Sequence, residues 1–171
     1  MKNYPRIYSL STLGLIHHYE NDYLFHNMRT DFVGDSGSGK SIIADLLQLI
    51  FVGSEMFESA TRTMDEKREL DGLVLRTPHK GIDIGYAFLN IEIQSRHYIV
   101  IGCYLESNSK RTKPFIIQGS SDPKANLLPI GQPLQTKDFK REGNICPLDD
   151  LLSQMEEKGL FLSYWETVKP Y

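Results

Sequence analysis

Apolar and polar residues alternate along two stretches near the N-terminus, and this alternation predicts β-strands. Ile7 to Ile16 is rich in β-branched and aliphatic residues, and Tyr23 to Phe32 carries a looser alternation. Asn21-Asp22 between them is a turn signal. The two stretches are therefore predicted to be the first strands of a sheet, with the second one leading into a glycine-rich segment.

Two further stretches have apolar residues at helical spacing. Ile42 to Val52 is strongly apolar, and Gly53 is well placed to end a helix there. Leu148 to Lys158 has the pattern of an amphipathic helix. Two helices are therefore predicted, one directly after the glycine-rich segment and one near the C-terminus.

The middle of the chain returns to the pattern of strands. Ile82 to Gln94 and His97 to Glu106 are long strand candidates, and the short link at Arg96 predicts an antiparallel hairpin. Phe115 to Gln118 is a further short strand. From Gly119 to Gly143 the chain is polar and contains several prolines, which indicates a long loop or an ordered connection.

Composition and charge narrow the class of protein. The 171 residues fit one domain or one lobe of a larger one, and the net charge of −3 argues against a nucleic-acid binder whose whole surface is basic. No apolar run approaches the roughly 18 residues of a membrane-spanning helix, so no membrane association is expected. The N-terminus lacks an apolar signal core. Cys103 and Cys146 are too few for a disulfide scaffold, so we expect a reduced, cytoplasmic protein.

One segment satisfies the phosphate-binding pattern GxxxxGK(S/T), namely Gly34-Asp35-Ser36-Gly37-Ser38-Gly39-Lys40-Ser41. Its glycines permit positive φ angles and close approach, so that backbone N–H groups can point at phosphate oxygens. We expect Lys40 to reach the β- and γ-phosphates as the catalytic cation, and the Ser41 hydroxyl to ligate Mg²⁺. The segment therefore predicts a site for ATP (or GTP) with Mg²⁺, formed by residues 34–41 and the following Ile42.

The loop and its surroundings resemble the N-terminal part of ABC-type ATPase heads of the structural-maintenance-of-chromosomes (SMC) superfamily, most closely the MukB-like and Wadjet-type branch. The resemblance rests on Phe32 to Ile50, on Arg68 to Val74, which is similar to an Arg-x-Leu-x-Gly-Tyr-Val element, and on the opening hairpin. Ser36 replaces the usual Asn of that family, and Ile42 replaces the usual Thr. Neither departure removes the lysine or the serine of the loop.

The resemblance implies an α/β P-loop NTPase of the ABC/SMC head type. In such a lobe a strand–P-loop–helix unit (1–57) would pack with an antiparallel β subdomain (72–118), followed by a loop and helical tail (119–171). The family splits its head in sequence, and a C-terminal lobe supplies the signature motif and a second acidic strand. Neither feature is found in this chain. The expected partners are therefore that lobe or a second head in an ATP-dependent dimer, possible accessory subunits, and DNA through the full assembly.

Heads of this family also place a glutamine at the end of a strand, against the metal and the attacking water. Gln118 is the candidate that the resemblance implies as a catalytic residue, with Gln132 and Gln135 as rivals. The implied function is ATP binding that drives head dimerisation in DNA repair, chromosome organisation or defence against foreign DNA. Hydrolysis would need the completing lobe, and the isolated chain is expected to be inactive.

Two other functions stay open at this point. A compact stand-alone P-loop kinase or NTPase would turn over ATP by itself, whereas a nucleotide-dependent assembly module would bind it without hydrolysis. Other polar clusters favour ordinary roles. Adjacent His17 and His18 on a strand point to opposite faces and are expected to be exposed or capping residues, not metal ligands. The basic run Lys110-Arg111-Thr112-Lys113 is expected to be a solvated turn, with a DNA-backbone contact as the alternative.

Overall fold

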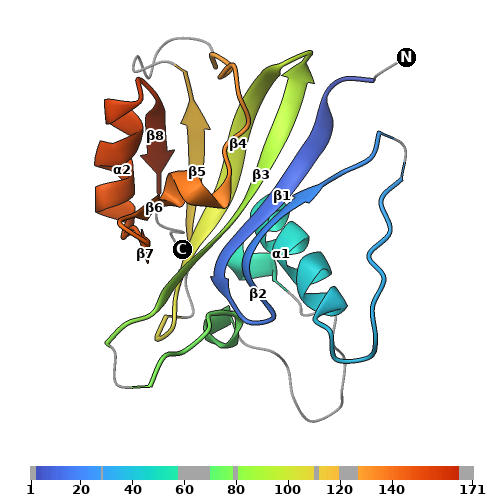
Figure 1. Ribbon diagram of the computed structural model, residues 1–171, viewed down its shortest axis with the longest axis vertical. Helices are drawn as coiled ribbons and strands as arrows, with labels where there is room; N and C mark the ends of the chain where they lie inside the picture. Colours follow the sequence, from blue (N-terminus) through green and yellow to red (C-terminus); the bar gives the residue numbers. More distant parts are fainter. Residues whose placement is uncertain are drawn as a thin grey trace.

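One six-stranded antiparallel sheet runs through the molecule, in the order β2-β1-β3-β4-β5-β8 (Figure 1). The computed structural model describes residues 3–27, 29–57, 70–78, 81–109, 112–119 and 127–165. The strands of the sheet are β1 (Arg6–Leu15), β2 (His18–Leu24), β3 (Ile84–Gln94), β4 (His97–Glu106), β5 (Lys113–Gln118) and β8 (Phe161–Tyr164). The α-helices of the described part are α1 (Lys40–Val52) and α2 (Leu148–Glu157).

Short elements connect these strands and helices. They are the 3-10 turns η1 (Ser54–Met56), η2 (Leu70–Leu73) and η3 (Thr136–Phe139), and the two-residue strands β6 (Lys140–Arg141) and β7 (Asn144–Ile145), which pair with each other. Within the described residues, no helix is both long and apolar enough to cross a membrane.

Tight turns make the main hairpins antiparallel. Two residues, Ile16 and His17, separate β1 from β2, and His17 adopts a positive φ of 61°. The β3–β4 link is equally short and places Arg96 at a φ of 58°. Because a two-residue link can join only antiparallel neighbours, these turns fix the direction of four of the six strands.

The sheet is covered on both faces. Along β3, Tyr86 and Phe88 face a core shared with η3 and α2, whereas Ala87 and Leu89 belong to the clusters that include α1. Phe139 of η3 lies at the centre of the first core, stacked on Phe88 with ring centroids 4.1 Å apart. Figure 1 shows the resulting layers, with α1 and α2 on opposite sides of the sheet.

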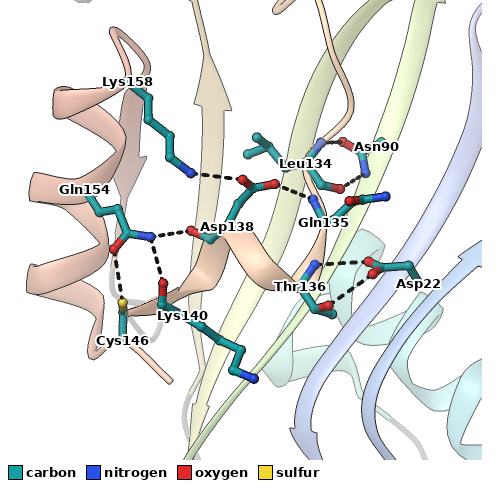
Figure 2. Close-up of polar contacts among 10 residues, drawn as sticks. All are labelled: Asp22, Asn90, Leu134, Gln135, Thr136, Asp138, Lys140, Cys146, Gln154 and Lys158. Carbon is teal, nitrogen blue, oxygen red and sulfur yellow. Dashed lines mark hydrogen bonds and ion pairs between the residues drawn. The ribbon is translucent and has the colours of Figure 1, made fainter. Parts of the chain in front are cut away.

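Buried and partly buried polar contacts hold the segment before α2 on the sheet (Figure 2). The Asn90 side chain donates to the carbonyl oxygen of Leu134 at 2.8 Å and accepts from its N–H at 2.9 Å. Asp22 of β2 accepts from the N–H and the hydroxyl of Thr136, at 3.1 and 3.0 Å. The polar stretch that the sequence indicated as a loop or ordered connection is therefore ordered over 127–143.

The predicted α/β P-loop NTPase fold of the ABC/SMC head type is wrong. Such a fold has a parallel sheet, whereas every pairing in the six-stranded sheet is antiparallel. The N-terminal strands and the central hairpin, predicted as separate units, belong to the same sheet because β1 pairs with β3. Strands that are buried on both faces have nearly continuous apolar sequences. Such sequences occur in antiparallel and in parallel sheets, so they do not reveal the direction of the strands.

The strand predicted over Tyr23–Phe32 is also wrong. The second strand is β2, which includes the predicted turn residues Asn21 and Asp22 and ends at Leu24. The described residues between Leu24 and the glycine-rich loop belong to no strand. There Phe25 packs on Phe32 with ring centroids 5.9 Å apart. The apolar positions of this stretch therefore form a local aromatic contact in place of a strand pairing.

Other elements follow the sequence patterns. The helix predicted over Ile42–Val52 is α1, which begins two residues earlier and ends at Gly53 with a φ of 78°. The β3–β4 hairpin and α2 are confirmed. The segment Gly72–Arg76 belongs to no strand of the sheet, since it completes η2 and then makes a single bridge from Val74 to Leu15. Residues 68, 69, 110 and 111, on which part of the resemblance and the basic run rest, lie outside the described residues.

Candidate phosphate-binding loop

The glycine-rich loop forms a tight turn that leads directly into α1. The N–H of Ser38 donates to the carbonyl oxygen of Asp35 at 3.2 Å, which closes the turn. Gly37 and Gly39 have φ angles of 83° and 88°, in the left-handed region that disfavours other residues. Two of the three glycines therefore have the positive φ that the sequence predicted for them.

Gly34 and Gly37 differ in what surrounds them. A Cβ atom on Gly34 would lie 2.7 Å from the Ser38 hydroxyl oxygen and 3.3 Å from the Ser38 Cβ atom, so the two ends of the turn lie close together. At Gly37 a Cβ atom would meet nothing within 4 Å. Residues 34–38 are all exposed. The turn is therefore closed at its base and open to solvent at its tip.

Lys40 folds back over this turn. Its ammonium group donates to the carbonyl oxygen of Gly34, to that of Asp35 at 2.7 Å, and to the Ser38 hydroxyl at 3.3 Å. A lysine ammonium has three N–H donors, and these contacts match that number. The positive charge is therefore held at the mouth of the turn while it stays exposed to solvent.

The first turn of α1 adds the field of the helix N-terminus. Gly39 is the N-cap, and its carbonyl oxygen accepts from the N–H of Ile42 at 3.0 Å. The first N–H groups of a helix have no partner within the helix, and they carry a partial positive charge. Ser41 lies in this turn, half-buried, whereas the Ile42 side chain is fully buried in the core. The Ile42 side chain therefore cannot reach a bound anion, and its N–H already donates to Gly39.

Gly39 is buried against the β1–β2 hairpin. His18, 7% exposed at the start of β2, places its Nε2 atom 2.8 Å from the Gly39 carbonyl oxygen. His17, the other predicted histidine, is exposed. Sequence reasoning expected capping or exposed histidines but did not connect either one with the loop. The sequence shows only a histidine next to the turn of the first hairpin. That position does not indicate a contact with Gly39, 21 residues further along the chain.

Gln118 is not brought to the loop within this chain. The strand pairings through β4 and β3 place its neighbour Ile117 at the same level of the sheet as Ser9, which is near the start of β1. The loop touches His18, beyond the other end of β1. At about 3.3 Å per residue and about 4.8 Å between strands, the separation is about 20 Å along the strands and about 19 Å across them, from β5 to β2. The Gln118 side-chain oxygen is buried with no hydrogen-bond partner among the described residues.

The rival glutamines lie on a different feature. Gln132 and Gln135 line a surface pocket of about 540 Å³ next to η3, together with Asp138 and Lys158. Those two charged side chains form an ion pair at 2.9 Å, drawn in Figure 2. None of the residues that line this pocket belongs to the glycine-rich loop. The chain therefore holds the loop and the predicted glutamines in separate places.

The part of the chain that is described contains no group of three or more His, Cys, Asp and Glu side chains that could hold a metal ion. Comparison of the chain with models of known protein families gave no match, and comparison with curated protein sequences gave none either.

Proposed function

We propose that residues 34–41 bind the phosphates of ATP together with Mg²⁺. The observation that carries this proposal is the exposed turn with two left-handed glycines, covered by the Lys40 ammonium and continued by the N-terminus of α1. Exposed backbone N–H groups, a fixed cation and a helix N-terminus attract the same ligand, a group with dense negative charge.

Each part of the loop would make a different contact with the nucleotide. The exposed N–H groups of the turn and of the first helical turn would donate to phosphate oxygens. The Lys40 ammonium would exchange its donors from the loop carbonyls to the β- and γ-phosphates. The Ser41 hydroxyl would be the protein ligand of Mg²⁺, which neutralises the charge of the phosphates when bound.

We also propose that this chain works as one lobe of an SMC-like ATPase in a DNA-handling machine. The resemblance of the loop and of the helix after it supports this proposal. Gln118 lies away from the loop, so in this proposal the residues that orient water for hydrolysis come from another lobe or a second copy. Val33, directly before the loop, is 93% exposed and leaves room beside the site for such a partner.

Calorimetric titration with Mg-ATP tests the binding proposal. We expect the wild-type chain to bind and the Lys40→Ala variant to lose about 2–3 kcal/mol, or about 30- to 150-fold in affinity, because a charge-assisted contact with phosphate is removed. Lys137→Ala is the matched control, since it removes an exposed lysine from η3. Equal affinities of the wild type and the Lys40→Ala variant would refute the proposal.

A further inference from the structure

His18 of β2 links the loop to Tyr23 of the same strand. The Nε2 atom of His18 lies 2.8 Å from the carbonyl oxygen of Gly39, and its Nδ1 atom lies 2.6 Å from the Tyr23 hydroxyl. The two rings meet edge to face, with centroids 5.7 Å apart. Both nitrogens of the imidazole are therefore engaged, one with the loop and one within the strand.

The partner of Nε2 fixes one proton position on the ring. A carbonyl oxygen only accepts, so Nε2 of His18 carries a proton and donates it to Gly39. Burial raises the pKa of Tyr23, which keeps its hydroxyl protonated and able to donate to Nδ1. The His18 ring therefore links the Tyr23 hydroxyl to the carbonyl oxygen of Gly39.

The contact with His18 falls on the residue at which the loop becomes a helix. Gly39 is the N-cap of α1, with φ 88° and ψ 15°, and no side chain caps the helix there. A Cβ atom on Gly39 would lie 2.7 Å from the Cβ atom of His17 and 2.9 Å from Nε2 of His18. The hairpin therefore touches the backbone of the loop directly and holds it at the residue where the turn becomes a helix.

A trans peptide links this carbonyl to the amide that would bind phosphate. The C=O of one residue and the N–H of the next point in opposite directions across a planar trans peptide. When His18 holds the oxygen of Gly39 toward the hairpin, it turns the N–H of Lys40 away from the hairpin. The Lys40 amide is the first N–H of α1, one of the donors that have no partner within the helix.

We infer that His18 is a positioning residue of the phosphate-binding loop, which orients the Gly39–Lys40 peptide toward a bound triphosphate. This inference rests on the proposed nucleotide binding and adds to it a residue outside the loop motif. His18 acts through Gly39 and does not itself touch the nucleotide, since both of its nitrogens have partners in the protein.

Two substitutions of His18 separate positioning from general stability. In His18→Gln the amide nitrogen takes the place of Nε2 and can donate to Gly39, whereas in His18→Asn the shorter amide reaches only the place of Nδ1. We expect His18→Asn to weaken Mg-ATP binding about fivefold, the value of one neutral hydrogen bond, and His18→Gln to bind within about twofold of the wild type. His17→Asn, the same change at the exposed neighbour, is expected to bind like the wild type.

Calorimetry with Mg-ATP on the folded variants measures these differences, with thermal unfolding recorded alongside. A purely structural role would lower the melting temperature of both His18 variants and leave the affinity of the folded molecules unchanged. Equal affinities of His18→Asn and wild type would overturn the inference, as would a loss in His18→Gln as large as that in His18→Asn. Absence of Mg-ATP binding by the wild type would refute the proposed function itself, and the inference with it.

Nitrogen NMR of the imidazole gives a second test without nucleotide. We expect a proton on Nε2 of His18, and a shifted Lys40 amide resonance in His18→Asn but not in His17→Asn. A ring without a proton on Nε2 would overturn the inference even if the chain binds Mg-ATP.

Discussion

Gly37 and Gly39 share a left-handed backbone but differ in their surroundings. The tip at Gly37 is open, whereas Gly39 is packed against His17 and His18. Alanine at either position pays about 1–2 kcal/mol for the left-handed backbone, and at Gly39 it also collides with the hairpin. We expect Gly39→Ala to lower the free energy of unfolding by clearly more than Gly37→Ala does, as measured in urea. Equal losses would contradict the packing of the loop on the hairpin.

The cysteines give a prediction on reactivity. Burial raises the pKa of the Cys103 thiol to about 12, and burial also raises the pKa of Cys146. The thiolate is the reactive form, so both thiols stay neutral and shielded at pH 8. We expect a thiol reagent at pH 8 to modify neither cysteine of the folded chain and both after unfolding. Rapid modification of Cys103 in the folded chain would contradict its place between the sheet and α1.

At the scale of elements, Phe139 joins η3 to the sheet. It is fully buried and contacts Tyr86, Phe88 and Phe115. We expect Phe139→Ala to lower the free energy of unfolding by about 3–5 kcal/mol, because the ring leaves a cavity. Phe51→Ala is the matched control, since Phe51 is 56% exposed on α1 and its loss should cost under about 1 kcal/mol. Similar effects of the two substitutions in urea unfolding would contradict this arrangement of the core.

The sequence predicted those elements whose pattern is set locally. The β3–β4 hairpin has a two-residue link at Arg96 and an apolar pattern on both sides of it, and α1 has a helical period with Gly53 at its end. The strand expected over 23–32 failed because the contact between Phe25 and Phe32 uses the same apolar positions. β8 was not predicted, since Phe161–Tyr164 is only four residues long and its partner β5 is distant in sequence.

The candidate site was predictable in part for the same reason. A phosphate-binding loop is a contiguous motif, so Gly34 to Ser41 could be identified from their spacing alone. The contact between His18 and Gly39 joins two elements and depends on how the hairpin packs, which spacing does not encode. The α/β P-loop NTPase fold was inferred from the resemblance, and it is wrong because the N-terminal strands and the central hairpin join in one antiparallel sheet.

At the scale of the whole molecule, the chain is expected to bind nucleotide without completing its hydrolysis. The loop supplies a cation and backbone donors, whereas Gln118 lies near the opposite end of the sheet. We therefore expect no release of phosphate above background when the isolated chain is saturated with Mg-ATP. Sustained turnover that is abolished in Lys40→Ala would contradict this expectation and would favour a stand-alone NTPase.

The most direct test of nucleotide binding at residues 34–41 is a residue-resolved NMR titration of the amide signals with Mg-ATP. Binding at the loop predicts that the largest shifts fall on Gly37 to Ser41 and that Lys40→Ala suppresses them. Shifts concentrated instead around the pocket at Gln132 and Gln135, or no shifts at saturating Mg-ATP, would contradict the account.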